Sequence, residues 1–200
     1  MANDKAAGLA GVIAGRTAIA TVGKEGKGLT YRGYSINDLA EQATFEEVAH
    51  LLVYGRLPTK PELGDYKEKL CNLRALPQPL KTVLEQVPGK AHPMDVMRTG
   101  CSALGPLEPE GESRDQIAVA NRLIACFSSI LLYWHHFHAS GKRIDTETDD
   151  DSGAGDFLHL LHGKKPDELH RRAVDVSLIL YAEHEFNAST FTARTIISTL

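Results

Sequence analysis

One long helical stretch near the middle of the chain constrains the fold most. After Gln116, apolar residues recur every three or four positions, which is the period of an amphipathic helix. The apolar positions are Ile117, Ala120, Leu123, Ile124, Phe127, Ile130, Leu131 and Trp134. Because this face is broad, it has to be buried against several neighbouring elements. We therefore predict an all-α, multi-helical domain in which this helix is packed by several others.

Shorter helices are predicted on both sides of this stretch. Thr44 and Glu47 have the spacing of a capping box, and Gly55 can end that helix in a left-handed conformation. Two prolines at positions that a first helical turn tolerates mark further helix starts. The additional helices are expected over residues 79–87, 93–103 and 166–181. Residues 105–112 hold two prolines and two glycines and are predicted to form a loop.

Strand character is confined to the first part of the chain. Residues 12–14 form a short apolar run. Residues 17–22 and 29–34 are β-prone runs that flank the glycine-rich segment 23–28. This pattern predicts a small β-hairpin. The glycine-rich segment lacks the Ser or Thr and the following helix that a phosphate-binding loop requires. The expected organisation is an N-terminal extension with the hairpin over residues 1–35 and a helical part over residues 36–200.

Composition excludes several classes of protein. With 42% hydrophobic and 24% charged residues, the chain is not expected to be disordered. Its net charge of −4 argues against nucleic-acid binding, which needs clustered positive charge. No unbroken apolar run reaches the ~18 residues of a membrane span, and no apolar signal core follows Met1. Three dispersed cysteines are expected to be reduced thiols in a cytoplasmic protein.

The nine histidines raise the hypothesis of a metal site. His135, His136 and His138 cannot all face one ion from a helix, because only residues three or four apart share a face. The acidic residues 145–151 lack the glycine and the final glutamate of a calcium loop, and we expect a solvated loop that caps the next helix. We therefore predict no metal centre, and a metal-binding helical protein stays as an alternative.

Residues 181–194 are the strongest candidate for a functional site. They follow the apolar run 176–180 and gather His, Glu, Asn, Ser, Thr and Arg side chains. An apolar helix that ends in polar residues places hydrogen-bonding groups at the mouth of a buried site. His184 could donate to a carboxylate or ketone, and Ser189 could orient a neighbouring imidazole. The same residues also fit a simple helix-to-helix connection with Ser189 as the N-cap.

Several segments together resemble the citrate synthase family. Residues 184–190, His-Glu-Phe-Asn-Ala-Ser-Thr, are similar to the substrate-pocket motif of that family. The other similar segments are residues 8–12, 29–34, 45–59 and 92–100. Residues 147–152 and 181–194 look most like the bacterial 2-methylcitrate synthase branch of the family.

The resemblance implies an almost entirely α-helical enzyme with a large and a small domain, working as a homodimer or higher oligomer. Residues 1–200 are then expected to be the first part of the large domain. The implied activity is an acyl transfer that condenses propionyl-CoA (or acetyl-CoA) with oxaloacetate to 2-methylcitrate (or citrate). The acyl-CoA is a substrate, and no separate cofactor is implied. In this chemistry a carboxylate takes a proton from the carbon next to the thioester, while histidines hydrogen-bond the enolate and the ketone oxygen.

The resemblance gives roles to few residues of this chain. His184 matches the histidine that hydrogen-bonds oxaloacetate, and Ser189 matches a residue that orients the enol-stabilising histidine. No catalytic residue is expected within the chain, since the family's two catalytic histidines, its aspartate and its carboxylate-binding arginines belong to segments beyond Leu200. The apolar ending 193–200 has no capping signal, so we expect an N-terminal fragment that is inactive alone. A non-catalytic helical oligomerisation module is the alternative function.

Overall fold

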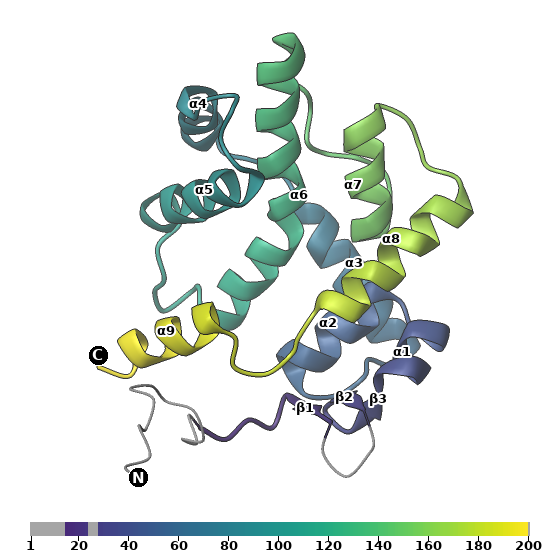
Figure 1. Ribbon diagram of the computed structural model, residues 1–200. Coiled ribbons are helices and arrows are strands. Elements are labelled where there is room, and N and C mark those ends of the chain that lie inside the picture. Colours follow the sequence, from purple (N-terminus) through teal and green to yellow (C-terminus); the bar gives the residue numbers. More distant parts are fainter. Residues whose placement is uncertain (1–14, 24–27, 200) are drawn as a thin grey trace, which may run out of the picture.

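The computed structural model describes residues 15–23 and 28–199. Within these residues the chain forms three short strands and nine helices (Figure 1). The strands are β1 (Ala20–Val22), β2 (Leu29–Tyr31) and β3 (Tyr34–Ser35). The helices are α1 (Ile36–Gln42), α2 (Phe45–Tyr54), α3 (Lys60–Asn72), α4 (Gln78–Gln86), α5 (Pro93–Leu107), α6 (Gln116–Ser140), α7 (Gly153–His162), α8 (Glu168–Tyr181) and α9 (Ala188–Ile197). The predicted multi-helical fold with a small β-structure at its start is confirmed.

Helix α6 runs through the middle of the molecule and packs against α3, α4, α5 and α7 (Figure 1). Its residues Cys126, Ile130, Tyr133 and Trp134 are buried in one cluster with apolar side chains of α4 and α5. The broad apolar face read from the sequence is therefore covered by several helices, as expected from its width.

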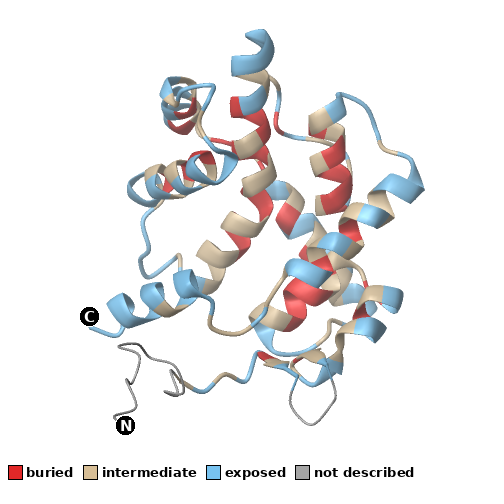
Figure 2. Ribbon diagram, viewed as in Figure 1, coloured by how far each residue is buried: buried red, intermediate tan, exposed pale blue. Residues whose placement is uncertain are grey.

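A second apolar cluster joins the small sheet to α1, α2 and α8. Tyr31 of β2 and Ile179 of α8 are fully buried in this cluster, although they lie far apart in the sequence. Figure 2 shows the buried residues along the facing sides of α2, α6, α7 and α8, whereas α9 has none. The sheet therefore packs against the C-terminal end of α8.

The sheet has three strands where the sequence predicted a two-stranded hairpin. The two expected partners pair antiparallel, with Ala20 opposite Tyr31. The predicted strand over residues 29–34 is split by a two-residue turn, after which β3 pairs with β2. Arg32 and Gly33 form this turn with φ of 49° and 90°, and two positive φ angles are what a tight hairpin turn requires. Residues 12–14, also read as β-prone, lie outside the described residues.

Most predicted helix ends agree with the structure, because they depend on local contacts. The capping box of α2 is formed, with Glu47 Oε2 accepting from Thr44 N at 2.8 Å, and Gly55 ends the helix at φ 85°. Two boundaries differ from the prediction by more than one residue. Helix α5 continues to Leu107, because Pro106 in the last turn removes only one N–H donor and Glu108 N still donates to Leu104 O. Helix α8 starts at Glu168 and not at residue 166, because the Asp167 side chain caps it.

The acidic loop before α7 does cap that helix, through the Ser152 side chain, which accepts from Gly155 N at 3.0 Å. Beneath the loop lies Arg74, which is only 3% exposed. Its guanidinium donates to the carbonyl oxygens of Thr148 and Ser152 and lies 3.5 Å from an Asp156 carboxylate oxygen. A buried arginine therefore holds the loop in place. The sequence of the loop itself did not predict this contact.

By length and composition alone, α6 is apolar enough to cross a membrane, and it is the one such helix in the described part of the chain. Half of its most apolar window is buried inside the structure. Its apolar residues are interrupted by Asn121 and by Arg122, which pairs with Glu108 at 2.8 Å. These features are typical of the core helix of a globular helical domain.

Candidate functional site

The segment between α8 and α9 carries the predicted pocket motif, and β2 holds its beginning in place. The Tyr31 hydroxyl donates to Ile179 O at 3.0 Å and accepts from Glu183 N at 3.2 Å. Tyr31 is fully buried, and desolvation by that burial raises the pKa of its hydroxyl. The phenol therefore joins the last turn of α8 to the residue just before His184.

Glu185 fixes the other side of His184. Its backbone has φ 72°, a left-handed conformation that non-glycine residues adopt only when other contacts support it. Glu185 Oε1 accepts from Val22 N of β1 at 3.0 Å, and Glu185 N donates to Glu183 Oε1 at 2.5 Å. His184 thus lies between two residues that the sheet and the local turn immobilise.

His184 and Ser189 are both exposed and both belong to the stretch that follows α8. Within the described residues, neither side chain has a hydrogen-bond partner. The simpler interpretation, in which Ser189 is the N-cap of α9, is wrong. Asn187 is the N-cap, with its side chain accepting from Thr190 N at 2.8 Å.

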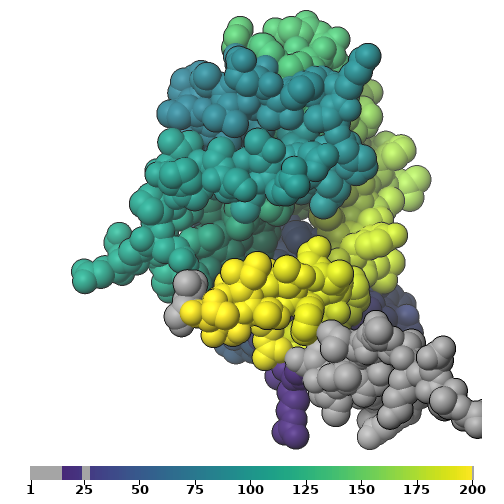
Figure 3. Space-filling view, turned by 60° about the vertical axis from the view of Figure 1, so that its left-hand side comes forward, coloured from purple at the N-terminus to yellow at the C-terminus, as the bar shows by residue number. Residues whose placement is uncertain are grey.

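Helix α9 lies on the outside of the molecule. The Arg194 guanidinium stacks over the Phe186 ring at 4.9 Å, which links the helix to the segment before it. Ile196 and Ile197 are 62% and 64% exposed. Figure 3 shows α9, in yellow, at the edge of a hollow whose other side is formed by residues coloured teal. Ser189, in the first turn of this helix, is itself exposed.

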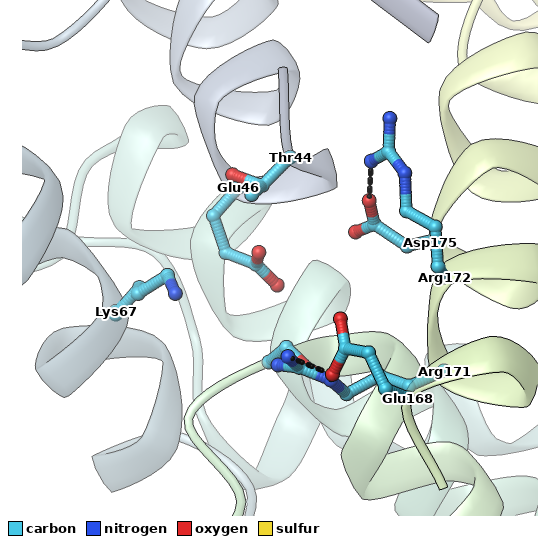
Figure 4. A pocket seen from close by; sticks show the side chains of 8 residues that line it. Thr44, Glu46, Lys67, Glu168, Arg171, Arg172 and Asp175 are labelled. Carbon is cyan, nitrogen blue, oxygen red and sulfur yellow. Dashed lines mark hydrogen bonds and ion pairs between the residues drawn. The ribbon is translucent and has the colours of Figure 1, made fainter. Parts of the chain in front are cut away.

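A charged cavity of about 70 Å³ is present elsewhere, between α2, α3 and α8 (Figure 4). The residues that line it are Thr44, Glu46, Lys67, Ser152, Glu168, Arg171, Arg172 and Asp175. Glu46 is 1% exposed, and its Oε1 accepts from Gly153 N at 2.8 Å. Burial, followed by smaller effects that include the Asp175 charge, raises the pKa of Glu46.

The residues considered as metal ligands have structural roles or are exposed. Within residues 15–23 and 28–199, no three His, Cys, Asp or Glu side chains are grouped to hold a metal ion. His136 Nε2 donates to Leu160 O at 2.8 Å and so joins α6 to α7, whereas His135 and His138 are exposed. The three cysteines are free.

Two features of these sites were missed by the sequence interpretation. The clamp by Tyr31 and Glu185 joins residues about 150 positions apart, and no local pattern signals such a contact. Glu46 follows the Thr44 cap in the first turn of α2, where acidic residues are ordinary, so its burial was not foreseeable.

The helical fold, together with this fixed polar segment, defines the class of protein. Residues 8–200 match the family described as citrate synthase, C-terminal domain, and the chain belongs to this family. A 2-methylcitrate synthase of Shewanella oneidensis is 63% identical over 97% of this chain and 52% of that relative. Another 2-methylcitrate synthase, from Corynebacterium glutamicum, is 39% identical over 98% of this chain and 53% of that relative.

Solved structures agree with this assignment. The citrate synthase of Thermotoga maritima has a TM-score of 0.80 and 32% identity over 96% of this chain and 51% of that one. A ternary complex of carboxymethyl coenzyme A and oxaloacetate with the citrate synthase of Thermoplasma acidophilum has a TM-score of 0.84 and 28% identity over 94% of this chain and 50% of that one. The chain therefore spans about half the length of the relatives it matches.

Proposed function

We propose that this chain is part of a 2-methylcitrate synthase, which condenses propionyl-CoA (or acetyl-CoA) with oxaloacetate to give 2-methylcitrate (or citrate). The observation that carries the proposal is the 63% identity to the Shewanella oneidensis enzyme over 97% of this chain. The two acyl groups differ by one methylene, which is worth only about 1–3 kcal/mol in a pocket. Acetyl-CoA therefore stays as the alternative donor.

In this proposal His184 binds oxaloacetate. An imidazole N–H donates a hydrogen bond to the ketone oxygen, which gains negative charge as the enol attacks the ketone carbon. The exposure of His184, between the fixed residues Glu183 and Glu185, supports this role. Ser189 is a positioning residue whose hydroxyl orients a second imidazole, one that stabilises the enol of the acyl-CoA.

Alone, this chain is expected to lack synthase activity. The reaction needs a base to remove a proton from the carbon next to the thioester. His184 and Ser189 have binding and positioning roles, and neither is that base. In the whole enzyme we expect a homo-oligomer that uses the acyl-CoA as substrate without another cofactor.

Complementation between two halves tests the proposal. The chain is mixed with the part of the Shewanella oneidensis enzyme that it does not cover, and thiol release from propionyl-CoA plus oxaloacetate is measured. We expect turnover only in the mixture, with loss of at least tenfold for His184→Ala. His162→Ala, which changes another exposed histidine, is the matched control and should retain activity.

Gel filtration of each mixture separates failed assembly from failed catalysis. Turnover by the chain alone would contradict the expected inactivity. An assembled mixture whose His184→Ala variant is as active as the unchanged chain would contradict the role of His184.

A second candidate function is a helical oligomerisation module. Exposed apolar side chains favour it: Tyr181 is 88% exposed, and Ile196 and Ile197 are also largely uncovered. Apolar groups in such an arrangement are typical of protein–protein contact surfaces.

A further inference from the structure

The turn that carries His184 holds one residue in a conformation that its type disfavours. Among the described residues, Arg32 and Glu185 are the non-glycine residues with positive φ. Arg32 belongs to the tight turn between β2 and β3, which requires such an angle. Glu185, with φ 72°, lies in neither a hairpin nor a helix, because α8 ends at Tyr181 and α9 starts at Ala188. A strained backbone of this kind persists only where surrounding contacts impose it, and such residues concentrate at functional sites.

Both the side chain and the backbone of Glu185 make contacts that impose this conformation. Glu185 Oε1 accepts from Val22 N of β1 at 3.0 Å. Glu185 N donates to Glu183 Oε1 at 2.5 Å, and Glu185 O accepts from Asn187 N at 3.1 Å. The small sheet runs beside this segment (Figure 1). The start of the chain therefore helps to set a backbone angle 163 positions further on.

The residues on both sides of His184 are held, whereas His184 itself is exposed. Glu183 N donates to the Tyr31 hydroxyl at 3.2 Å, and the Phe186 ring stacks against the Arg194 guanidinium. The His184 imidazole has no hydrogen-bond partner within the described residues. Its direction therefore depends on the turn of the backbone from which it projects.

We infer that Glu185 is a positioning residue, whose carboxylate, bound to β1, fixes the turn from which His184 donates a hydrogen bond to the ketone oxygen of oxaloacetate. This inference rests on the proposed function, in which His184 binds oxaloacetate. A donor that is already in place stabilises the developing charge without the cost of ordering a mobile group. A glycine at position 185 would adopt the same φ without strain, but it could not accept from Val22 N.

Substitutions at position 185 separate positioning from stability. Glu185→Ala removes the acceptor and keeps the strain, whereas Glu185→Gly removes the acceptor and relieves the strain. The urea midpoint should therefore fall less for Glu185→Gly than for Glu185→Ala. Glu185→Gln keeps an oxygen that can accept from Val22 N and should behave like the unchanged chain. Glu110→Gly, at an exposed glutamate outside the helices, is the matched control.

Order parameters from ¹⁵N relaxation of the 200-residue chain give a readout that does not require activity. We expect the His184 amide to be near the rigid value of about 0.85 in the unchanged chain, in Glu185→Gln and in Glu110→Gly. In Glu185→Ala and Glu185→Gly it should fall below about 0.6. Equal values in all variants would overturn the inference, whether or not the chain forms part of a synthase.

Kinetics of the reconstituted mixture, in which the chain is combined with the part of the Shewanella oneidensis enzyme that it does not cover, test the effect on the substrate. We expect kcat/KM for oxaloacetate to fall about tenfold in Glu185→Ala and in Glu185→Gly, while KM for propionyl-CoA stays within about twofold.

A loss confined to Glu185→Ala would follow stability and would overturn the positioning role, as would unchanged kinetics for oxaloacetate in both variants. Absence of turnover in the unchanged, assembled mixture would instead contradict the proposed function, and the order parameters would still decide whether Glu185 fixes His184.

Discussion

At the scale of single residues, Glu85 is the centre of a small ionic network. Its carboxylate accepts from Arg143 Nε at 2.7 Å and from the Tyr133 hydroxyl at 2.7 Å. The hydrogen bond from Arg143, followed by that from Tyr133, lowers the pKa of Glu85 from 4.5 to about 2. The network joins α4 to the end of α6 and to the loop beyond it.

The pKa of Glu85 predicts a pH dependence of stability. Because it is lower in the folded state, Glu85 stabilises the fold above pH 4.5, and this stabilisation is lost as the pH falls toward about 2. We expect the urea midpoint of Glu85→Gln to fall less between pH 5 and pH 3 than that of the unchanged chain. Equal slopes would show that the bond is not maintained in solution, and Glu110→Gln serves as the control.

The Tyr31 hydroxyl gives a second prediction at this scale. Tyr31→Phe keeps the ring but leaves Glu183 N without its acceptor and removes one of the two donors to Ile179 O, which should cost about 1–3 kcal/mol. Urea unfolding measures the loss, and hydrogen exchange at the Glu183 amide should become faster. Tyr34→Phe, at an exposed tyrosine of the same sheet, should change neither quantity.

At the scale of elements, the crossing of α5 and α6 depends on the absence of a side chain at Gly100. A Cβ there would lie 2.6 Å from Cγ2 of Ile130, which is fully buried. Gly100→Ala should therefore cost about 1–3 kcal/mol through overpacking, more than the helix gains from alanine. Gly64→Ala, in open space on α3, should instead raise stability by about 1 kcal/mol. Urea midpoints that move in the same direction for both variants would contradict this account.

The elements that could be predicted from the sequence are those fixed by neighbouring residues. The Thr44–Glu47 box and the apolar period of α6 are local, so both were identified correctly. Pro106 misled the prediction because proline removes a helical hydrogen bond and usually ends a helix, whereas α5 continues through Pro106 to Leu107. Arg74 and Glu46 could not be assigned, since their surroundings come from segments 74 to 107 residues away in sequence.

The motif predicts a candidate site at residues 181–194, but the contacts that hold this segment could not be predicted from it. The order of polar residues indicated where a pocket segment begins, and the structure leaves His184 and Ser189 exposed there. The supports of that segment come from β1 and β2, at the opposite end of the chain. No pattern within residues 181–194 specifies those partners.

At the scale of the whole molecule, the exposed apolar residues of α9 predict association. Ile196 and Ile197 stand out from a helix that has no buried residue. We expect light scattering to detect oligomers of the chain at micromolar concentration, and the double variant Ile196→Ser with Ile197→Ser to shift the population toward monomer. A chain that is monomeric without these changes would contradict the prediction and the oligomerisation alternative.

The bond from Tyr31 to α8 also has a consequence for how the protein is made. The hydroxyl and its acceptor, Ile179 O, are separated by 148 positions in the chain. At about 5–20 residues per second, the ribosome needs roughly 7 to 30 seconds to add them. During that interval the Tyr31 hydroxyl lacks this acceptor, and only α1 and α2 of the helices in its cluster are available to cover the sheet.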